Sequence, residues 1–342
     1  MAVKTFDCST PNMGMIVTDE NRKELGFVSE NVKLDIDIGD TDDFVLTLNL
    51  NDWDKSKYWF GHCIYIPNTE YGGMIEKLEV KTESSELLFS GYTWRGLLKQ
   101  KIVEPPPGQS HLILNQDLNI SIMQVVSNQF DGLIMGTSDP AGITLHNWKV
   151  DRYTTVYDAI MKFLNAYDYR LNIEYVTDED TITGYVFLKA APVKDWSEEL
   201  EYSQDNRIHF DIVDARNGIN HLICGGKGEN EDRLIVHLYV QEDGAIGNSQ
   251  YYTGLAERTA FYDYSSAEDE EDLRNNGIEK LKELQNYKSS SLTIDDVDIE
   301  LGDIIGGRER ITNTTLKKPI IGKIFTNDGI KTDIQYKVKG DD

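Results

Sequence analysis

The pair of residues with the most ligand-like spacing is His221 and Cys224, in the run HLIC. Tetrahedral zinc sites use histidine and cysteine, but they need four ligands, and no second His or Cys pair lies nearby. On a strand, two residues three positions apart point to opposite faces of the sheet. The spacing therefore favours a packed strand that carries a histidine, with a zinc site as the alternative.

A glycine-rich run follows at once, Gly225-Gly226-Lys227-Gly228. A phosphate-binding loop needs a Ser or Thr after the lysine, at the start of a helix, so that backbone amides and the helix dipole hold the phosphates. Here the next residues are Glu229-Asn230-Glu231-Asp232, whose carboxylates would repel phosphate. We therefore predict the tip of a hairpin.

Other candidate chemistry is weaker. The acidic run 295–298 (DDVD) lacks the order of acid and glycine positions found in EF-hand calcium loops, so a solvated strand edge is favoured over a calcium site. The sequence contains neither a G-x-S-x-G nucleophile elbow nor an H-E-x-x-H zinc motif. We predict no catalytic residues, no metal and no cofactor.

The stretch GYTWRGLLKQKIVEPPPG at 91–108 contains the tryptophan-arginine pair Trp94 and Arg95. It reads as the end of a strand, one helical turn at 97–101, and then three prolines. Consecutive prolines fix φ and remove backbone donors, so the chain leaves this turn through a stiff segment. Trp94 and Arg95 either plug the core beneath the turn or contact a neighbouring subunit.

Composition limits the possible partners. The chain has 342 residues, 59 Asp and Glu against 34 Lys and Arg, and a formal net charge of -25. Such a charge disfavours binding to nucleic acid or to anionic lipid. No apolar run is long enough to span a membrane, and the N-terminus lacks the apolar core of a signal peptide. The three cysteines are widely spaced, which fits assembly in a reducing cytoplasm.

Hydrophobic periodicity outlines the secondary structure. Alternating residues predict strands in the first part of the chain, at 32–38, 44–50, 63–66, 74–80 and 86–90. Helical spacing then predicts helices at 121–130 and 156–167, and a strand pair follows at 171–175 and 181–188. From about residue 205 the pattern is β again, interrupted by one helix at 265–287 that Ser265 and Glu268 would cap.

A weak internal repeat connects the two ends of the chain, since the pattern at 60–91 is similar to the one at 301–340. We therefore predict an α+β, mainly β fold in which the short strands form a barrel or a sandwich and 109–195 forms a small α/β domain. Duplication of a barrel is one explanation of the repeat, and the general similarity of β patterns is the other.

Several of these segments, in this order, resemble the tail hub proteins of long-tailed bacteriophages and prophages, including those named prophage endopeptidase tail proteins. The segments are 91–98 with Pro105-Pro106, the helix TTVYDAI at 154–160, NHLICGGKG at 220–228 followed by 258–264 and the acidic helix, and LGDII at 301–305. The resemblance covers nearly the whole chain. It implies two similar β-barrel domains: the first barrel would span 1–108, the inserted small α/β domain 109–195, and the second barrel, with the helix 265–287 inserted in it, 196–342.

The resemblance implies a homotrimer whose six barrels form a ring with pseudo-sixfold symmetry. Such a ring joins the tail tube (or a distal tail protein) to tail-tip or receptor-binding proteins, and DNA passes through its channel without binding. The chain would assemble in the host cytoplasm, away from membranes, and end in the virion at the tail tip. We expect subunit contacts at Trp94 and Arg95 and at barrel edges around Leu48 and Ile304, because an unpaired strand edge accepts a partner strand.

Members of this family that act as lysins usually carry that activity in a long C-terminal extension. This sequence ends at Asp342, just after the last predicted strand, so a structural role without enzymatic activity is expected. Two alternatives remain. One is a peptidoglycan endopeptidase (a tail-associated lysin), as the family name suggests; the other is a carbohydrate-binding tail-tip module, for which 18 tyrosines and 5 tryptophans could provide stacking surfaces.

Overall fold

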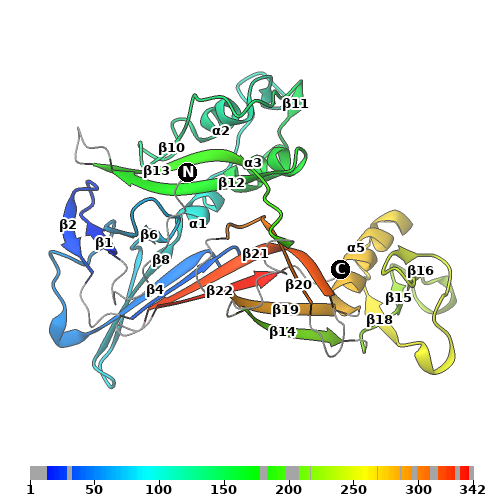
Figure 1. The fold of residues 1–342 in the computed structure, drawn as a ribbon. Coiled ribbons are helices and arrows are strands. Elements are labelled where there is room, and N and C mark those ends of the chain that lie inside the picture. The colour runs from blue at the N-terminus through cyan, green and yellow to red at the C-terminus, as the bar shows by residue number, and fades with distance from the viewer. Residues whose placement is uncertain are drawn as a thin grey trace. The chain divides into compact units, whose positions relative to one another are not determined.

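The chain forms two compact units in a computed structural model (Figure 1). The structure describes residues 14–28, 33–177, 183–197, 208–215, 217–267, 269–285, 287–294, 299–308, 315–327 and 332–338. Unit 1 comprises Met1–His209 with Leu292–Val338, and unit 2 comprises Phe210–Ser291 with Lys339–Asp342.

The large sheet of unit 1 contains strands from both ends of the chain, in the order β22-β21-β3-β4-β8-β7, with β20 paired to β21. Its strands are β3 (Lys33–Ile38), β4 (Asp43–Asn49), β7 (Lys77–Lys81), β8 (Glu86–Tyr92), β20 (Ile304–Arg308), β21 (Thr315–Asn327) and β22 (Thr332–Val338). β3 and β4 bury every second residue, as predicted. The antiparallel pairing of β3 with β21 links segments that are nearly 300 residues apart in the sequence.

A smaller antiparallel sheet in unit 1 has the order β2-β1-β5-β6. Its strands are β1 (Ile16–Thr18), β2 (Glu24–Phe27), β5 (Cys63–Tyr65) and β6 (Gly72–Met74). The short 3-10 helix η1 (Leu50–Asp52) follows β4, and α1 (Trp94–Lys99) follows β8. α1 is the predicted helical turn, displaced toward the N-terminus so that it includes Trp94 and Arg95.

The segment 109–195 forms a layer of helices on a three-stranded sheet with the order β10-β13-β12. Its elements are β9 (Ile113–Leu114), α2 (Leu118–Val126), β10 (Ile134–Gly136), β11 (Trp148–Lys149), α3 (Val156–Asn165), β12 (Tyr169–Thr177) and β13 (Gly184–Pro192). β10 runs parallel to β13, and β12 runs antiparallel to it. The predicted turn at 178–180 lies outside the described residues.

Both helices of this segment begin at side-chain caps. The Thr155 hydroxyl accepts from the Asp158 backbone N–H at the start of α3, whose predicted apolar stripe is buried. α2 starts three residues earlier than predicted because the Asp117 carboxylate caps it, accepting from the Asn119 N–H. It also ends earlier, at Val126, and Asn128 beyond it has a left-handed φ of 60° that no α-helix accommodates.

Unit 2 packs one helix, α5 (Glu270–Leu284), on a four-stranded sheet with the order β17-β16-β15-β18. Its elements are β14 (Ile208–Ala215), β15 (His221–Gly225), η2 (Asn230–Asp232), β16 (Ile235–Val240), β17 (Ile246–Gly247), η3 (Gly254–Ala256), β18 (Thr259–Asp263), α5 and β19 (Tyr287–Ile294). β14 pairs with β19. Leu273 and Leu281 of α5 are buried against Leu222, Cys224 and the other inward residues of the sheet, as the predicted apolar face requires.

The predicted capping box of this helix is wrong. Asp269, and not Ser265, caps α5, because its carboxylate accepts from the Asp272 N–H and three acidic residues fill the first turn. The fold is thus α+β and mainly β, and no sheet among the described ranges closes on itself. Within those ranges, no helix is both long and apolar enough to cross a membrane.

Gly277 provides a test of how tightly unit 2 is packed. A Cβ at this helical position would lie 2.5 Å from Cys224 Sγ and 2.8 Å from Leu238 Cδ1, both in the core. Alanine favours a helix over glycine by about 1 kcal/mol, but overpacking a core costs about 1–3 kcal/mol. We expect Gly277→Ala to lower the free energy of unfolding of unit 2, measured by urea denaturation.

Asn275→Ala is the matched control, since Asn275 is exposed on the same helix. It makes the same kind of gain in helix propensity without a clash, so stability should stay equal or rise slightly. A Gly277→Ala protein as stable as this control would show that the helix-sheet contact is looser than described here.

Candidate functional site

The tryptophan-arginine turn is attached to the loop between β3 and β4. The backbone N–H and the hydroxyl of Thr93 donate to the Asp42 carbonyl, at 2.9 and 3.0 Å, and the same hydroxyl accepts from the Gly96 N–H to cap α1. A Cβ at Gly96 would lie 2.3 Å from that carbonyl, so only glycine permits this approach.

Trp94 is buried within its own protomer. Its side chain is only 1% exposed, and its ring stacks on Tyr175 with centroids 5.4 Å apart, while Tyr175 stacks on Tyr65 at 3.8 Å. These rings connect α1, the small sheet and β12 into one core. The sequence left two positions open for Trp94, the protein core or a contact with a neighbouring subunit. The structure places its side chain in the core.

Arg95 is also buried, and it begins a chain of alternating charges. Its guanidinium contacts Glu70 through Nε at 3.0 Å and Nη2 at 2.9 Å, and it also donates to the Leu171 carbonyl of β12. Glu70 Oε1 lies 3.3 Å from Lys323 Nζ, which is 2.9 Å from Glu300 Oε2. Four residues from four separate segments of unit 1 thus compensate one another's charge.

The pKa values of Arg95 and Glu300 are shifted toward the charged forms. Burial alone would lower the pKa of Arg95, but the carboxylate of Glu70 raises it above its ordinary value. Burial alone would raise the pKa of Glu300, yet the ammonium group of Lys323 brings it below 4.5. Arg95 and Glu300 therefore stay ionised at neutral pH, and the contacts that connect them through Glu70 and Lys323 are ion pairs.

A second buried carboxylate, Asp303, joins β12 and the segment after β13 to the loop that leads into β20. Its Oδ1 accepts from Arg170 Nε at 2.8 Å and from the Lys194 backbone N–H at 2.9 Å. Its Oδ2 accepts from the Trp196 indole at 3.2 Å and from the Glu300 N–H at 3.3 Å. All these donors converge on one side chain, which fixes the segment 194–196 beside β20.

The predicted free strand edge is wrong at Leu48, whereas β20 pairs as a strand only with β21 among the described residues, and of its residues Ile304 has backbone partners on the other side. β4, which carries Leu48, is paired on both sides, to β3 and to β8, and the Leu48 side chain is buried. Ile304 pairs with Pro319 on one side, while on the other its N–H donates to Lys194 O and its carbonyl accepts from Trp196 N–H. Since Trp94 and Arg95 are buried too, only half-buried Ile304 keeps side-chain surface for a subunit contact.

Unit 2 places His221 and Cys224 on opposite faces of β15, as predicted. His221 Nδ1 lies 2.7 Å from Glu257 Oε1, and its Nε2 lies 2.8 Å from His237 Nδ1. The carboxylate and the second imidazole are therefore on opposite sides of the ring and cannot ligate one ion together with it. Cys224 lies in the core beneath α5, where burial raises the pKa of its thiol to about 11.

The glycine run forms the end of the β15–β16 hairpin, again as predicted. Gly226 and Lys227 exchange backbone hydrogen bonds with Leu234, and Gly228 has a left-handed φ of 106°. In the described part of the chain, no three His, Cys, Asp or Glu side chains converge as a metal site would require. The acidic run 295–298 lies outside the described residues.

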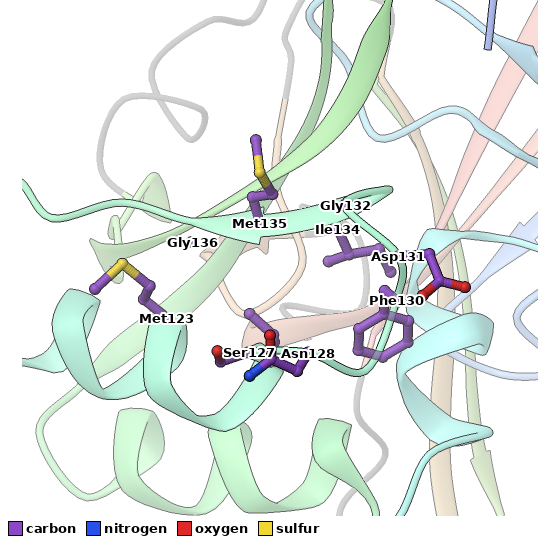
Figure 2. Close-up of a pocket in the computed structure, with 10 residues that line it drawn as sticks. Met123, Ser127, Asn128, Phe130, Asp131, Gly132, Ile134, Met135 and Gly136 are labelled. Carbon is purple, nitrogen blue, oxygen red and sulfur yellow. The ribbon is translucent and has the colours of Figure 1, made fainter. Parts of the chain in front are cut away.

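An open groove of about 410 Å³ lies between the C-terminal part of α2 and β10 (Figure 2). Its apolar walls are Met123, Val126, Phe130, Ile134 and Met135. The left-handed turn residues Asn128, Asp131 and Gly132, types that tolerate this conformation, shape its rim. At Gly136 a Cβ would lie 2.8 Å from Met123 Cα, so glycine lets α2 lie directly against the strand.

Sequence reasoning missed both the groove and most of the ion-pair network. The groove had a local signal, the left-handed formers in NQFDG at 128–132, which mark the tight turn between α2 and β10. Glu70 and Lys323 had none, because each is an ordinary charged residue until the fold brings them together.

Neither a protein-family model nor a curated protein sequence matches the chain. Solved structures do. The 43 kDa tail protein of prophage MuSo2 from Shewanella oneidensis aligns with 95% of this chain and 98% of its own length, with a TM-score of 0.50 and 11% identity. The chain has the fold of a prophage tail protein.

Two further tail proteins align over similar lengths. The tail protein from Neisseria meningitidis MC58 has a TM-score of 0.46 and 13% identity, over 95% of this chain and 96% of its own. Prophage tail protein gp18 from Listeria monocytogenes EGD-e has a TM-score of 0.45 and 10% identity, over 94% of each chain.

Removal of Asp303 should destabilise this tail-protein fold strongly. Asp303→Ala leaves the buried Arg170 guanidinium and the Trp196 indole without their acceptor, and breaking a buried ion pair costs about 3–5 kcal/mol. Urea denaturation at neutral pH measures the loss. Asp151→Ala is the control, because its pair with Lys162 is exposed and should contribute within about 1 kcal/mol. Equal effects of the two changes would contradict the assigned role.

The lowered pKa of Glu300 makes its contribution depend on pH. In the unfolded chain its pKa is near the ordinary 4.5 and in the folded chain it is lower, so the unfolded state takes up the proton first on acidification. The stabilisation is complete well above 4.5 and is lost as pH falls through the folded value. Glu300→Gln should therefore destabilise the protein more at about pH 7 than at about pH 3, measured by urea denaturation. A difference that does not change with pH would refute this assignment.

Proposed function

We propose that the chain is a structural tail protein of a phage or prophage, a hub adaptor that joins the tail tube to the tail tip. The fold likeness to the MuSo2 tail protein supports this, because it extends over nearly the full length of both chains. In this proposal the chain contains two similar β-barrels with an α/β insertion. Three copies form a ring around the channel, and the protein ends in the virion after assembly in the host cytoplasm.

The charge balance supports a channel that DNA crosses without binding. With a net charge of -25, the chain has a large surplus of carboxylates over the Lys and Arg that contact phosphates in DNA-binding proteins. The surfaces that face DNA in the ring are then negative or neutral.

We further propose that the chain has no enzymatic activity. The two described cysteines would be poor nucleophiles, since burial raises the pKa of the Cys63 thiol to about 12 and that of Cys224 to about 11. His221, which lies beside the Glu257 carboxylate, has its second ring nitrogen engaged by His237. Zymography on bacterial cell walls tests the endopeptidase alternative, for which a clearing band abolished by a point mutation would be the sign.

For the carbohydrate-binding alternative, the aromatic loop at 53–60 is the most suitable place. Trp59, however, already contacts Trp53 at 5.9 Å, Phe60 at 5.1 Å and the ammonium group of Lys55 at 4.2 Å. These contacts within the loop occupy the ring that a sugar would need for stacking, so the structural role is favoured.

The edge strand β2 is the surface we propose for contact between subunits. Among the described residues it pairs as a strand only with β1, and it exposes Leu25 and Phe27, the latter by 62%. A free edge with exposed apolar side chains can accept a strand from a neighbouring chain. Three chains joined by such heterologous contacts close into a ring.

Light scattering across a concentration series tests the assembly. We expect a species near three times 38.9 kDa that grows with concentration, since mass action controls a contact that tube and tip proteins normally reinforce. Phe27→Ser should weaken trimer formation. Ile102→Ser is the control, because Ile102 is 45% exposed elsewhere on unit 1.

Two outcomes would count against this proposal in different ways. A stable twofold dimer at every concentration would contradict the threefold hub. A trimer equally weakened by both changes, or by neither, would keep the hub but remove β2 from its interface.

A further inference from the structure

The tripeptide Asn-Gly-Ile occurs twice in the chain, at 217–219 and at 276–278, and both copies lie in unit 2. An asparagine before a glycine can lose its side-chain amide without an enzyme, because glycine has no side chain to hinder attack by its own backbone nitrogen. In an unfolded peptide the residue after the asparagine has the strongest influence on this reaction, and here it is the same in both copies. A difference between the two sites in the native protein therefore comes from the fold.

Asn217 lies in the connection between β14 and β15, where neither it nor Gly218 belongs to a helix or a strand. The Asn217 side chain is exposed and makes no hydrogen bond with any described residue. Rotation of this side chain toward the next peptide unit therefore breaks no side-chain hydrogen bond of the described structure. Only a local rearrangement, and not the unfolding of unit 2, brings its amide carbon to the Gly218 nitrogen.

Asn276 has the same neighbours in sequence, but it lies inside α5. Its Nδ2 donates to the Asp272 carbonyl at 2.9 Å and to Asp272 Oδ1 at 2.8 Å. The helix directs the Gly277 backbone N–H into the preceding turn, away from the Asn276 side chain. Gly277 also packs so tightly that a Cβ there would lie 2.5 Å from Cys224 Sγ. The reaction at Asn276 must therefore wait until α5 opens.

We propose that Asn217 is a site of spontaneous deamidation and that α5 protects Asn276 from the same reaction. The backbone nitrogen of Gly218 attacks Cγ of Asn217, the new C–N bond closes a succinimide ring, and the side-chain nitrogen leaves as ammonia with the proton that the Gly218 nitrogen loses. Water then opens either C–N bond of the imide. One cleavage gives aspartate, and the other gives isoaspartate.

The reaction changes the chain just before a fixed point of unit 2. The Ile219 backbone N–H donates to the Leu284 carbonyl at 2.7 Å, and Asn220 Nδ2 donates to the Ala256 carbonyl at 2.8 Å. Isoaspartate at 217 carries the former side-chain methylene in its backbone, so it displaces the chain ahead of these bonds. Either product also adds a carboxylate to a chain whose net charge is already -25. The inference does not depend on the hub role.

Tryptic peptide mapping of the full chain tests the proposal after incubation at mildly alkaline pH. Trypsin releases NGINHLICGGK, which begins at Asn217, and NNGIEK, which contains Asn276. We expect the first peptide to gain the mass that replaces an amide by a carboxylate, and protein isoaspartate methyltransferase to label it. The second should convert at least about tenfold more slowly, because its helix must open first. A sample digested before incubation gives the background.

Two comparisons assign the difference to the fold. In urea that unfolds the chain, the two peptides should convert at similar rates, because both asparagines precede Gly-Ile. Gly218→Ala places a Cβ beside the attacking nitrogen and should slow the reaction at Asn217, and Asn217→Gln should abolish the mass gain in this peptide.

Three results would overturn the proposal. Conversion of Asn217 no faster than the background shows that the connection between β14 and β15 does not permit the reaction. Equal rates of the two peptides in the native protein show that α5 gives no protection. A difference in urea as large as in the native protein assigns the selectivity to the sequence and not to the fold.

Discussion

A buried carboxylate between two buried cations holds the parts of unit 1 together. Glu70 lies between Arg95 and Lys323, and all three side chains are almost completely removed from water. Transfer of each charge into the interior is costly by itself, so every member needs its partners. Arg95 belongs to α1 and also bonds β12, while Lys323 belongs to β21 and continues to Glu300. The position of the α/β segment relative to the large sheet therefore depends on this network, and Asp303 reinforces it from the other side.

Local patterns predicted most of the elements of the fold. The alternation around Ile36 and Leu46, and the stripe that includes Ile160 and Phe163, correspond to β3, β4 and α3 because burial of one face imposes its period on the sequence. The pairing of strands was not predictable in the same way. Which strand lies beside β4 depends on residues far away in the chain, and the free edge assigned to Leu48 failed for that reason.

The candidate sites likewise include features that a local sequence pattern predicts and features that depend on residues far away in the chain. The sequence drew attention to the Trp94-Arg95 pair, but a bulky aromatic beside a cation is compatible with both a core and an interface, and only the partners decide. Arg95 is in the core because Glu70 meets it there. The separation of His221 from Cys224 was predictable, since it follows from the pleat of a single strand. The groove beside α2 was not, because the residues at 128–132 indicate only a turn, and the packing of the helix and the strand on either side of that turn depends on the rest of the fold.

Amide hydrogen exchange on a Lys323→Met variant is the most direct measurement of the network's role. Methionine keeps much of the aliphatic stem and removes the charge that links Glu70 to Glu300. If the network positions the α/β segment, protection should fall together in α1, β12 and β21, while β15 and β16 of unit 2 stay protected. Loss of protection confined to β21, with α1 and β12 unchanged, would contradict that role.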